Sequence, residues 1–203
     1  MPATSLQDLY AQKLQLLLDA EQQGLNAMPQ LVQQVRNEQL RSALQQHHRE
    51  TEGHVQRLQQ LVGNRQSGQH TQNKECISMR ALIQEAQQML PNIQDPDTID
   101  AFIIGAQQAI EHHEIAAYGT ARTWAQQLGF DEDADLLQQT LDEEGKADKM
   151  LSSIAERSVN QQASRGSERE VGINSGGQGD RSQSSGASTT RSSDITSRGA
   201  DMR

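Results

Sequence analysis

The sequence contains few of the residues that build cross-links, sheets or membrane spans. Its 203 residues include one cysteine, four prolines and five aromatic residues. A single cysteine excludes an intramolecular disulfide and makes a reducing compartment the default. No apolar run approaches the roughly 20 residues of a membrane-spanning helix, and the N-terminal segment lacks the basic and apolar blocks of a signal peptide. We therefore expect a cytoplasmic protein that has no membrane partner.

The abundant residue types favour helices. Leu, Gln and Ala are common, whereas Val and the aromatic residues are scarce, and this balance favours helix over strand. Apolar residues recur in steps of three and four along five segments, and no segment has the alternation of a strand. The predicted helices cover residues 5–35, 37–63, 79–90, 98–128 and 131–155.

Several residues predict where these helices begin and end. Candidate N-terminal caps are Ser5 (in a capping box with Asp8), Asn37, Asp97 or Thr98, and Asp131. Gly63 and Gly129 predict helix ends, and Pro29 predicts a bend or a frayed last turn in the first helix.

The connections between the helices predict how they pack. The turns at Arg36–Asn37 and Gly129–Phe130 are short, so each joins two antiparallel helices into a hairpin. The connection between the two hairpins is long and carries its own short helix. The sequence therefore predicts an all-α fold, a ferritin-like antiparallel four-helix bundle with a long crossover that carries a short fifth helix.

The last 43 residues differ from the rest. Residues 161–203 contain ten Ser, seven Gly and six Arg with few large apolar residues, so they cannot bury enough apolar surface to fold. We expect one folded domain over residues 1–160 and a disordered tail over 161–203, whose partner is unknown. Because the net charge of the whole chain is −9 and the tail is almost neutral, the domain is acidic, which argues against nucleic acid as a partner.

Each of the four long helices has a carboxylate near the middle of its apolar stripe. A buried carboxylate without a partner is costly, and antiparallel helices of similar length bring their midpoints into one layer. A pair of metal ions is the plainest partner for such a layer. The central carboxylates are Glu21, Glu50, Glu114 and Glu144, and within one turn of them lie His47, His54, Glu111 and Asp148.

Carboxylates and imidazoles in this pattern suit two Fe or Mn ions. Di-iron bundles commonly use Glu-x-x-His motifs, whereas this chain has His47-x-x-Glu50-x-x-x-His54 and Glu144-x-x-x-Asp148. We favour Glu50 and Glu144 as bridging ligands, with Glu21, Glu114 and one helix-two histidine as terminal ligands. Whether that histidine is His47 or His54 stays open. Two alternatives also stay open: either histidine could support a ligand instead of binding metal, and the carboxylates could form inter-helix salt bridges without metal.

Three further residue sets have a functional and a structural interpretation. Adjacent side chains on a helix point about 100° apart, so only one of His112 and His113 can face the core, and we expect His113 at the surface. Tyr118 could donate a hydrogen bond to a ligand, but a core tyrosine with a hydrated hydroxyl is the commoner case. Cys76 is expected to be an inert thiol.

Four segments are distinctive: SLQDLYAQKLQLLLDAEQQ, HHRETEGHVQRLQQL, AIEHHEIAAYGTARTWAQQLG and LLQQTLDEEGKADKML. Together they span nearly all of residues 4–156 and resemble the YciE/YciF family of bacterial ferritin-like proteins. The resemblance implies a ferritin-like bundle, usually dimeric, that is linked to stress responses and has an inferred dimetal site without an established reaction. It places family motif positions at Glu21, His47, Glu50, Glu111, His112, Glu114, Glu144 and Asp148.

The sequence thus supports two functions. The leading hypothesis is a homodimeric dimetal protein that reacts with peroxide or oxygen, or handles iron, during stress. The alternative is a non-catalytic helical scaffold or dimerisation module with a vestigial metal site. A DNA-protecting role for the arginines of the tail is disfavoured by the acidic domain.

Overall fold

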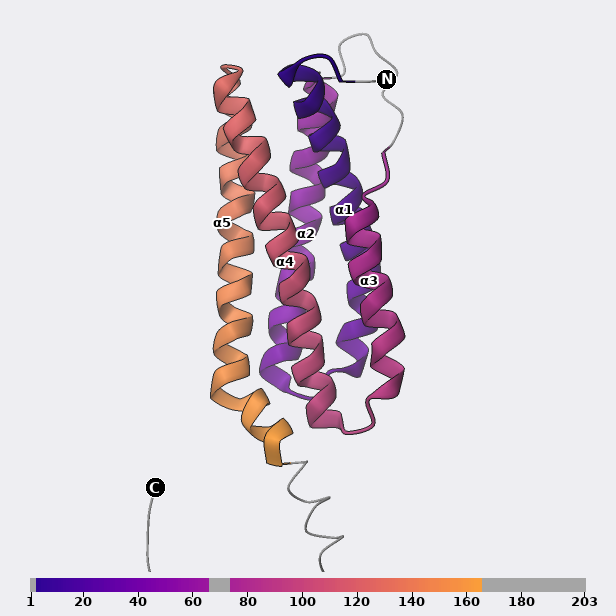
Figure 1. Cartoon of the computed structure of the whole chain (residues 1–203). Coiled ribbons are helices and arrows are strands. Elements are labelled where there is room, and N and C mark those ends of the chain that lie inside the picture. Colours follow the sequence, from indigo (N-terminus) through magenta and orange to yellow (C-terminus); the bar gives the residue numbers. More distant parts are fainter. Residues whose placement is uncertain (1–2, 66–73, 166–203) are drawn as a thin grey trace, which may run out of the picture.

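The computed structural model describes residues 3–65 and 74–165, and within them the regular elements are all helical (Figure 1). Five α-helices match the five predicted segments. They are α1 (Leu6–Gln34), α2 (Glu38–Arg65), α3 (Ile77–Met89), α4 (Pro96–Gln127) and α5 (Asp131–Ile154). A short 3₁₀ turn, η1 (Leu90–Asn92), follows α3, and a π-helical turn, η2 (Ala155–Val159), follows α5.

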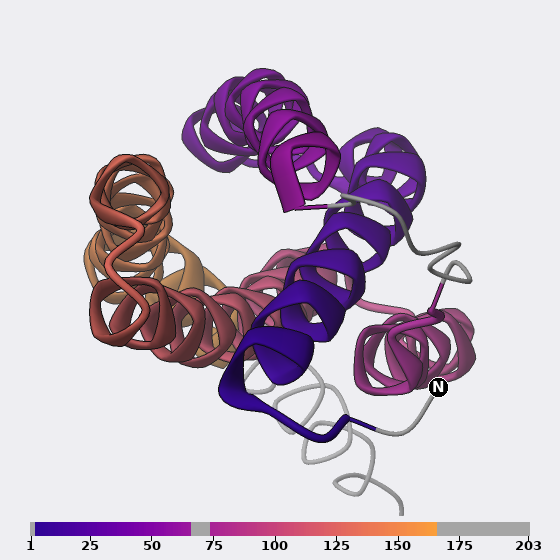
Figure 2. The same cartoon turned by 90° about the horizontal axis from the view of Figure 1, so that it is seen from above.

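The helices form the predicted ferritin-like bundle. The pairs α1/α2 and α4/α5 are hairpins, and α1 also packs on α4 while α2 packs on α5. The crossover helix α3 lies outside the four-helix core, against α1 and α4 (Figures 1 and 2). One side of the bundle is therefore covered by a fifth helix, whereas the α2/α5 side is not.

The caps of the first hairpin confirm the sequence prediction. Ser5 Oγ accepts a hydrogen bond from the backbone N–H of Asp8 (3.1 Å), and Asn37 Oδ1 accepts from the N–H groups of Gln39 and Leu40 (both 3.0 Å). The turn after α1 has a further support that the sequence did not reveal. The buried carboxylate of Asp100 accepts from the N–H groups of Arg36 and Asn37.

The starts of the second hairpin differ from the prediction. Helix α4 begins at Pro96, and its cap is Asp95, which accepts from the N–H of Thr98 (2.7 Å). Proline suits the first helical position because its φ is already helical, and it holds the preceding residue in an extended conformation. Asp131 belongs to the first turn of α5 rather than capping it. Gly129 ends α4 as predicted, with a φ of 72° that glycine adopts without strain.

Helix α1 contains Pro29 and continues to Gln34, one residue short of the predicted end. Helix α2 runs two residues past Gly63, where the sequence predicts its end. After η2 the chain stays helical to residue 165, five residues past the expected domain boundary. The rest of the predicted tail, residues 166–203, lies outside the described residues. None of the described helices is long and apolar enough to cross a bilayer.

The apolar core is divided into two clusters by a buried polar layer. One cluster contains Tyr10, Leu14, Leu58 and Leu137, near the end of the bundle where α1 begins. The other contains Leu40, Leu44, Ile103 and Leu151, near the opposite end. Between them, all four helices contribute buried polar residues. Three of the four central carboxylates that the sequence predicts are among these residues, whereas Glu50 is not. This layer consists of Glu21, His47, Thr51, His54, Glu111, Glu114 and Glu144.

Candidate metal centre

Two groups of potential ligands meet in the polar layer. One consists of Glu21, His54 and Glu144, and the other of His47, Glu111 and Glu144; within each group the ligand atoms lie within 4.8 Å of one another. All five residues are buried, and Glu144 belongs to both groups. The four long helices each contribute at least one ligand, which is what aligned helix midpoints predict.

The two oxygens of Glu144 face different histidines. Its Oε1 lies 2.8 Å from His54 Nδ1, and its Oε2 lies 3.9 Å from His47 Nε2. His54 Nδ1 is also 3.3 Å from Glu21 Oε1, and His47 Nε2 is 3.1 Å from Glu111 Oε1. A carboxylate that turns one oxygen toward each of two ligand groups has the arrangement of a bridging ligand.

Several of these buried atoms have no hydrogen-bond partner. They are both oxygens of Glu144, Oε2 of Glu111, and Nδ1 of both His47 and His54. The close approach of His54 Nδ1 to Glu144 thus lacks hydrogen-bond geometry. Buried polar atoms are almost always paired in folded proteins, so a cluster of unpaired ones needs an explanation. Carboxylate oxygens and imidazole nitrogens with unused lone pairs fit a cation.

The pKa values show how the layer is balanced without a cation. Burial raises the pKa of Glu114 and Glu144 well above that of an ordinary glutamate, and the neighbouring carboxylates raise it further. Burial also opposes charge on Glu111 and His47. The hydrogen bond between these two residues outweighs the effect of burial, so the pKa of Glu111 is lowered and that of His47 is raised. The layer therefore favours charge on the His47–Glu111 pair and disfavours it on Glu114 and Glu144.

Further side chains orient the ligands. Tyr118 donates to Glu21 Oε1 (2.5 Å), and Gln107 donates to Glu111 Oε1 (2.8 Å). Glu143 Oε2 lies 3.0 Å from His54 Nε2 and is itself paired with Arg57. Such partners fix ring orientation and tautomer in metal sites.

The structure places the other predicted site residues around these two groups. Glu114 is buried beside them but belongs to neither. Glu50 is half-exposed; its Oε1 accepts from Gln46, and its Oε2 lies 4.0 Å from His47 Nδ1. Asp148 lies further out and accepts from Gln108 (2.8 Å).

The neighbouring residues with alternative interpretations are also placed. His112 is exposed and reaches Asp148 (3.2 Å), whereas His113 is half-buried and lies 3.6 Å from Cys76 Sγ. The expectation that His113 is at the surface was wrong, because α3 covers that side of α4. Cys76 is buried. Burial alone would raise the pKa of its thiol, but the hydrogen bonds with His113 and Ser78 lower it to about 7.

Sequence reasoning missed two supporting residues. Glu143 was not among the predicted ligands or supporting residues, although its carboxylate contacts His54. Gln107 was also passed over, although the i, i+4 spacing to Glu111 could have revealed this pair. Tyr118 was weighed mainly as an ordinary core residue, but it is fully buried and its hydroxyl reaches a candidate ligand rather than water.

Comparisons with known proteins show the family to which the chain belongs. A family model described as a domain of unknown function (DUF892) matches residues 5–164. Protein YciF of Escherichia coli (strain K12) is 35% identical over 163 residues, which are 80% of this chain and 98% of that protein.

Two solved structures are similar as well. The crystal structure of the E. coli stress protein YciF aligns with a TM-score of 0.71 at 35% identity, covering 78% of this chain and 99% of the other. YcfI from Rhodopseudomonas palustris, described as a candidate structural protein, aligns with a TM-score of 0.71 at 35% identity, covering 75% and 96%. The chain belongs to the DUF892 family, the family of YciF, as its distinctive segments indicate.

Proposed function

We propose that this protein binds two Fe or Mn ions in the polar layer and acts in the bacterial stress response, reacting with peroxide or oxygen or handling iron. The observation that carries the proposal is Glu144. Its side chain is fully buried and belongs to both ligand groups, and neither of its oxygens has a hydrogen-bond partner. The description of the relative YciF as a stress protein supports the biological setting.

The residues present divide into two ligand sets. Glu21 and His54 would hold one ion, His47 and Glu111 the other, and Glu144 both. Bound Fe or Mn would supply redox chemistry toward peroxide or dioxygen, because few protein ligands per ion leave positions open.

The surrounding residues prepare these ligands. Glu143 holds His54 Nε2, so that Nδ1 faces Glu144, and Tyr118 fixes the carboxylate of Glu21. Burial raises the pKa of Glu114, which lies beside the centre, and so disfavours its charged form. The chain thus offers an oriented ligand set in a buried layer between two apolar clusters.

A second function, a non-catalytic helical scaffold or dimerisation module, is favoured by one observation and one comparison. The charged pair of His47 and Glu111 (3.1 Å) neutralises part of the layer without metal. YcfI is described as a candidate structural protein. A homodimer in the cytoplasm, without nucleic-acid or membrane partners, is compatible with either function and remains part of the proposal.

Metal analysis separates the two. Protein purified without chelators or a histidine tag should contain close to two Fe or Mn per chain, as dimetal bundles do. The matched control for any substitution at Glu144 is the exposed Glu132 on the same helix. Wild-type protein that contains no metal and takes up none in an anaerobic Fe(II) titration would favour the scaffold.

A further inference from the structure

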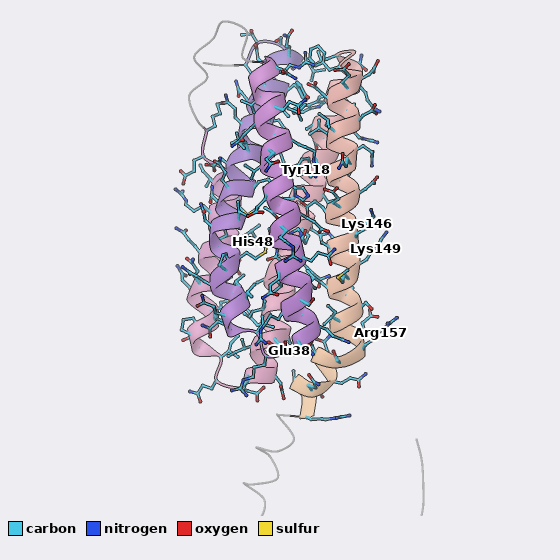
Figure 3. All side chains as sticks on the ribbon, turned by 180° about the vertical axis from the view of Figure 1, so that it is seen from behind. Glu38, His48, Tyr118, Lys146, Lys149 and Arg157 are labelled. Atoms are coloured by element: carbon cyan, nitrogen blue, oxygen red, sulfur yellow. The ribbon has the colours of Figure 1, made fainter. Side chains whose placement is uncertain are left out.

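Two pockets approach the polar layer from different sides of the bundle. One lies between α2 and α5 and has a volume of about 260 Å³. Its lining contains the charged or ionisable residues His47, Glu50, Glu111, Glu143 and Lys146, together with Gln46 and apolar side chains. The other lies between α1, α3 and α4, has a volume of about 320 Å³, and has no charged residue in its lining. Figure 3 shows the α2/α5 side, with Lys146 on α5 projecting outward.

The α2/α5 pocket connects solvent to the ligands. Glu50 is half-exposed, with one oxygen held by Gln46 (2.9 Å) and the other turned toward His47. His47 is only 6% exposed, and its Nδ1 has no hydrogen-bond partner. Its Nε2 lies 3.1 Å from Glu111 Oε1, within the candidate centre. From the surface inward, the pocket therefore presents the carboxylate of Glu50, then the unpaired Nδ1 of His47, and then the pair of His47 Nε2 and Glu111.

We infer that this pocket is the route by which divalent cations enter, and that Glu50 binds the cation transiently at its mouth before the His47 and Glu111 half of the centre receives it. This inference rests on the proposed dimetal function. It gives Glu50 a role different from the bridging role that its sequence position suggests, since Glu50 belongs to neither ligand group.

The charges of the pocket favour this route. Glu143 is paired with Arg57 and His54, and the exposed Lys146 contributes one positive charge at the rim. Among the residues that the structure describes, His47 is the only cationic partner of Glu50, so its carboxylate is available to an ion. The α1/α3/α4 pocket offers amides, alkyl groups and one thioether, and these do not repay the loss of water from a divalent cation.

Uptake kinetics test the role of Glu50. Metal-free full-length protein is mixed anaerobically with Co(II), whose absorption reports binding, in stopped flow at low ionic strength. Glu50→Gln should slow uptake about tenfold, because charge focusing changes association rates by at least that factor, while the final number of ions per chain stays the same. Glu52→Gln, at an exposed glutamate on the same helix, should leave the rate unchanged.

Two matched alanine substitutions test the route itself. Ala43 lines the α2/α5 pocket and Ala27 the other, and both are partly buried. Ala43→Phe should slow Co(II) uptake at least tenfold, whereas Ala27→Phe should not, with circular dichroism confirming that both variants fold.

Each other outcome has a definite meaning. An unchanged rate in Glu50→Gln, or slowing by Ala27→Phe alone, would overturn the inference and leave the dimetal proposal standing. A lower final stoichiometry in Glu50→Gln would make Glu50 a resident ligand and also overturn it. Wild-type protein that binds no Co(II), Fe(II) or Mn(II) would overturn both proposals.

Discussion

Replacing Glu144 by glutamine should separate the stability of the fold from that of the metal centre. The substitution keeps the shape of the side chain and removes the charge that both ligand groups share. In the metal-free protein, burial already disfavours the charged form of Glu144. We therefore expect metal-free Glu144→Gln to be as stable as wild type or slightly more stable, because a buried ionisable group can often be replaced without loss.

With metal the two proteins should differ clearly. A ligand at a free concentration 100 times its Kd stabilises the folded state by about 2.7 kcal/mol per site. In a domain of this size each kcal/mol moves the Tm by about 2–4 °C, so wild type should gain roughly 5–10 °C for each bound ion. Glu144→Gln should gain almost nothing, since neither ion would keep its full ligand set.

Differential scanning calorimetry with and without Fe(II) or Mn(II) measures these shifts. Glu132→Gln, at an exposed position on α5, serves as the control and should behave as wild type. An equal metal-induced rise of the Tm in Glu144→Gln and wild type would refute the assignment of Glu144 as the shared ligand. A metal-free variant that fails to fold would instead show that the carboxylate is needed for packing.

Other properties should follow from the same structure. Since the pKa values of Glu114, Glu144 and His47 are raised, the metal-free fold binds more protons than the unfolded chain. Urea titrations should therefore show the free energy of unfolding falling as pH rises from about 5 to about 7, whereas the metal-loaded protein should lose stability on acidification. Tyr118→Phe removes the hydroxyl that donates to Glu21 on α1, and it should lower the free energy of urea unfolding of the metal-free protein by about 1.5–3 kcal/mol. An unchanged free energy of unfolding would show that this hydrogen bond does not stabilise the fold. Deleting residues 166–203, which the sequence predicts to be disordered, should leave the Tm and metal content unchanged. After excess Fe(II) and oxygen, sedimentation should find a dimer-sized particle, and a shell holding hundreds of irons would place the protein among storage proteins.

The helices could be predicted because their signals are local. The steps of three and four in the apolar stripes and the Asn37 cap depend on residues close in sequence, and all five helices were predicted correctly. The start of α4 was predicted two residues too late because Asp97 and Thr98 were weighed as caps and the effect of Pro96 on Asp95 was not. The support of the first turn by Asp100 joins residues 64 positions apart, and no local pattern reveals it.

The site could be predicted as a layer but not atom by atom. Position along the helices predicts that Glu21, Glu114 and Glu144 lie at one height. The structure brings Glu21 and Glu144 into one ligand group and buries Glu114 beside them. Whether a side chain reaches the centre depends on the rotation of its helix, and helix rotation is set by packing between distant segments. Glu50 and His54 lie four residues apart on α2, yet His54 is buried in a ligand group and Glu50 is half-exposed at a pocket mouth.

The charge of the polar layer links its pH dependence to its capacity for metal. Four buried carboxyl groups, Glu21, Glu111, Glu114 and Glu144, share this layer with only two imidazoles. If all four were ionised, their charges would repel one another in a buried layer, at a cost that proteins avoid by shifting pKa values. The raised pKa values of Glu114 and Glu144 lower this cost in the metal-free fold. Bound divalent cations would lower it in another way, because their charge favours ionised carboxylates and metal binding releases protons. On this argument protons and metal ions compete for the carboxylates of the layer.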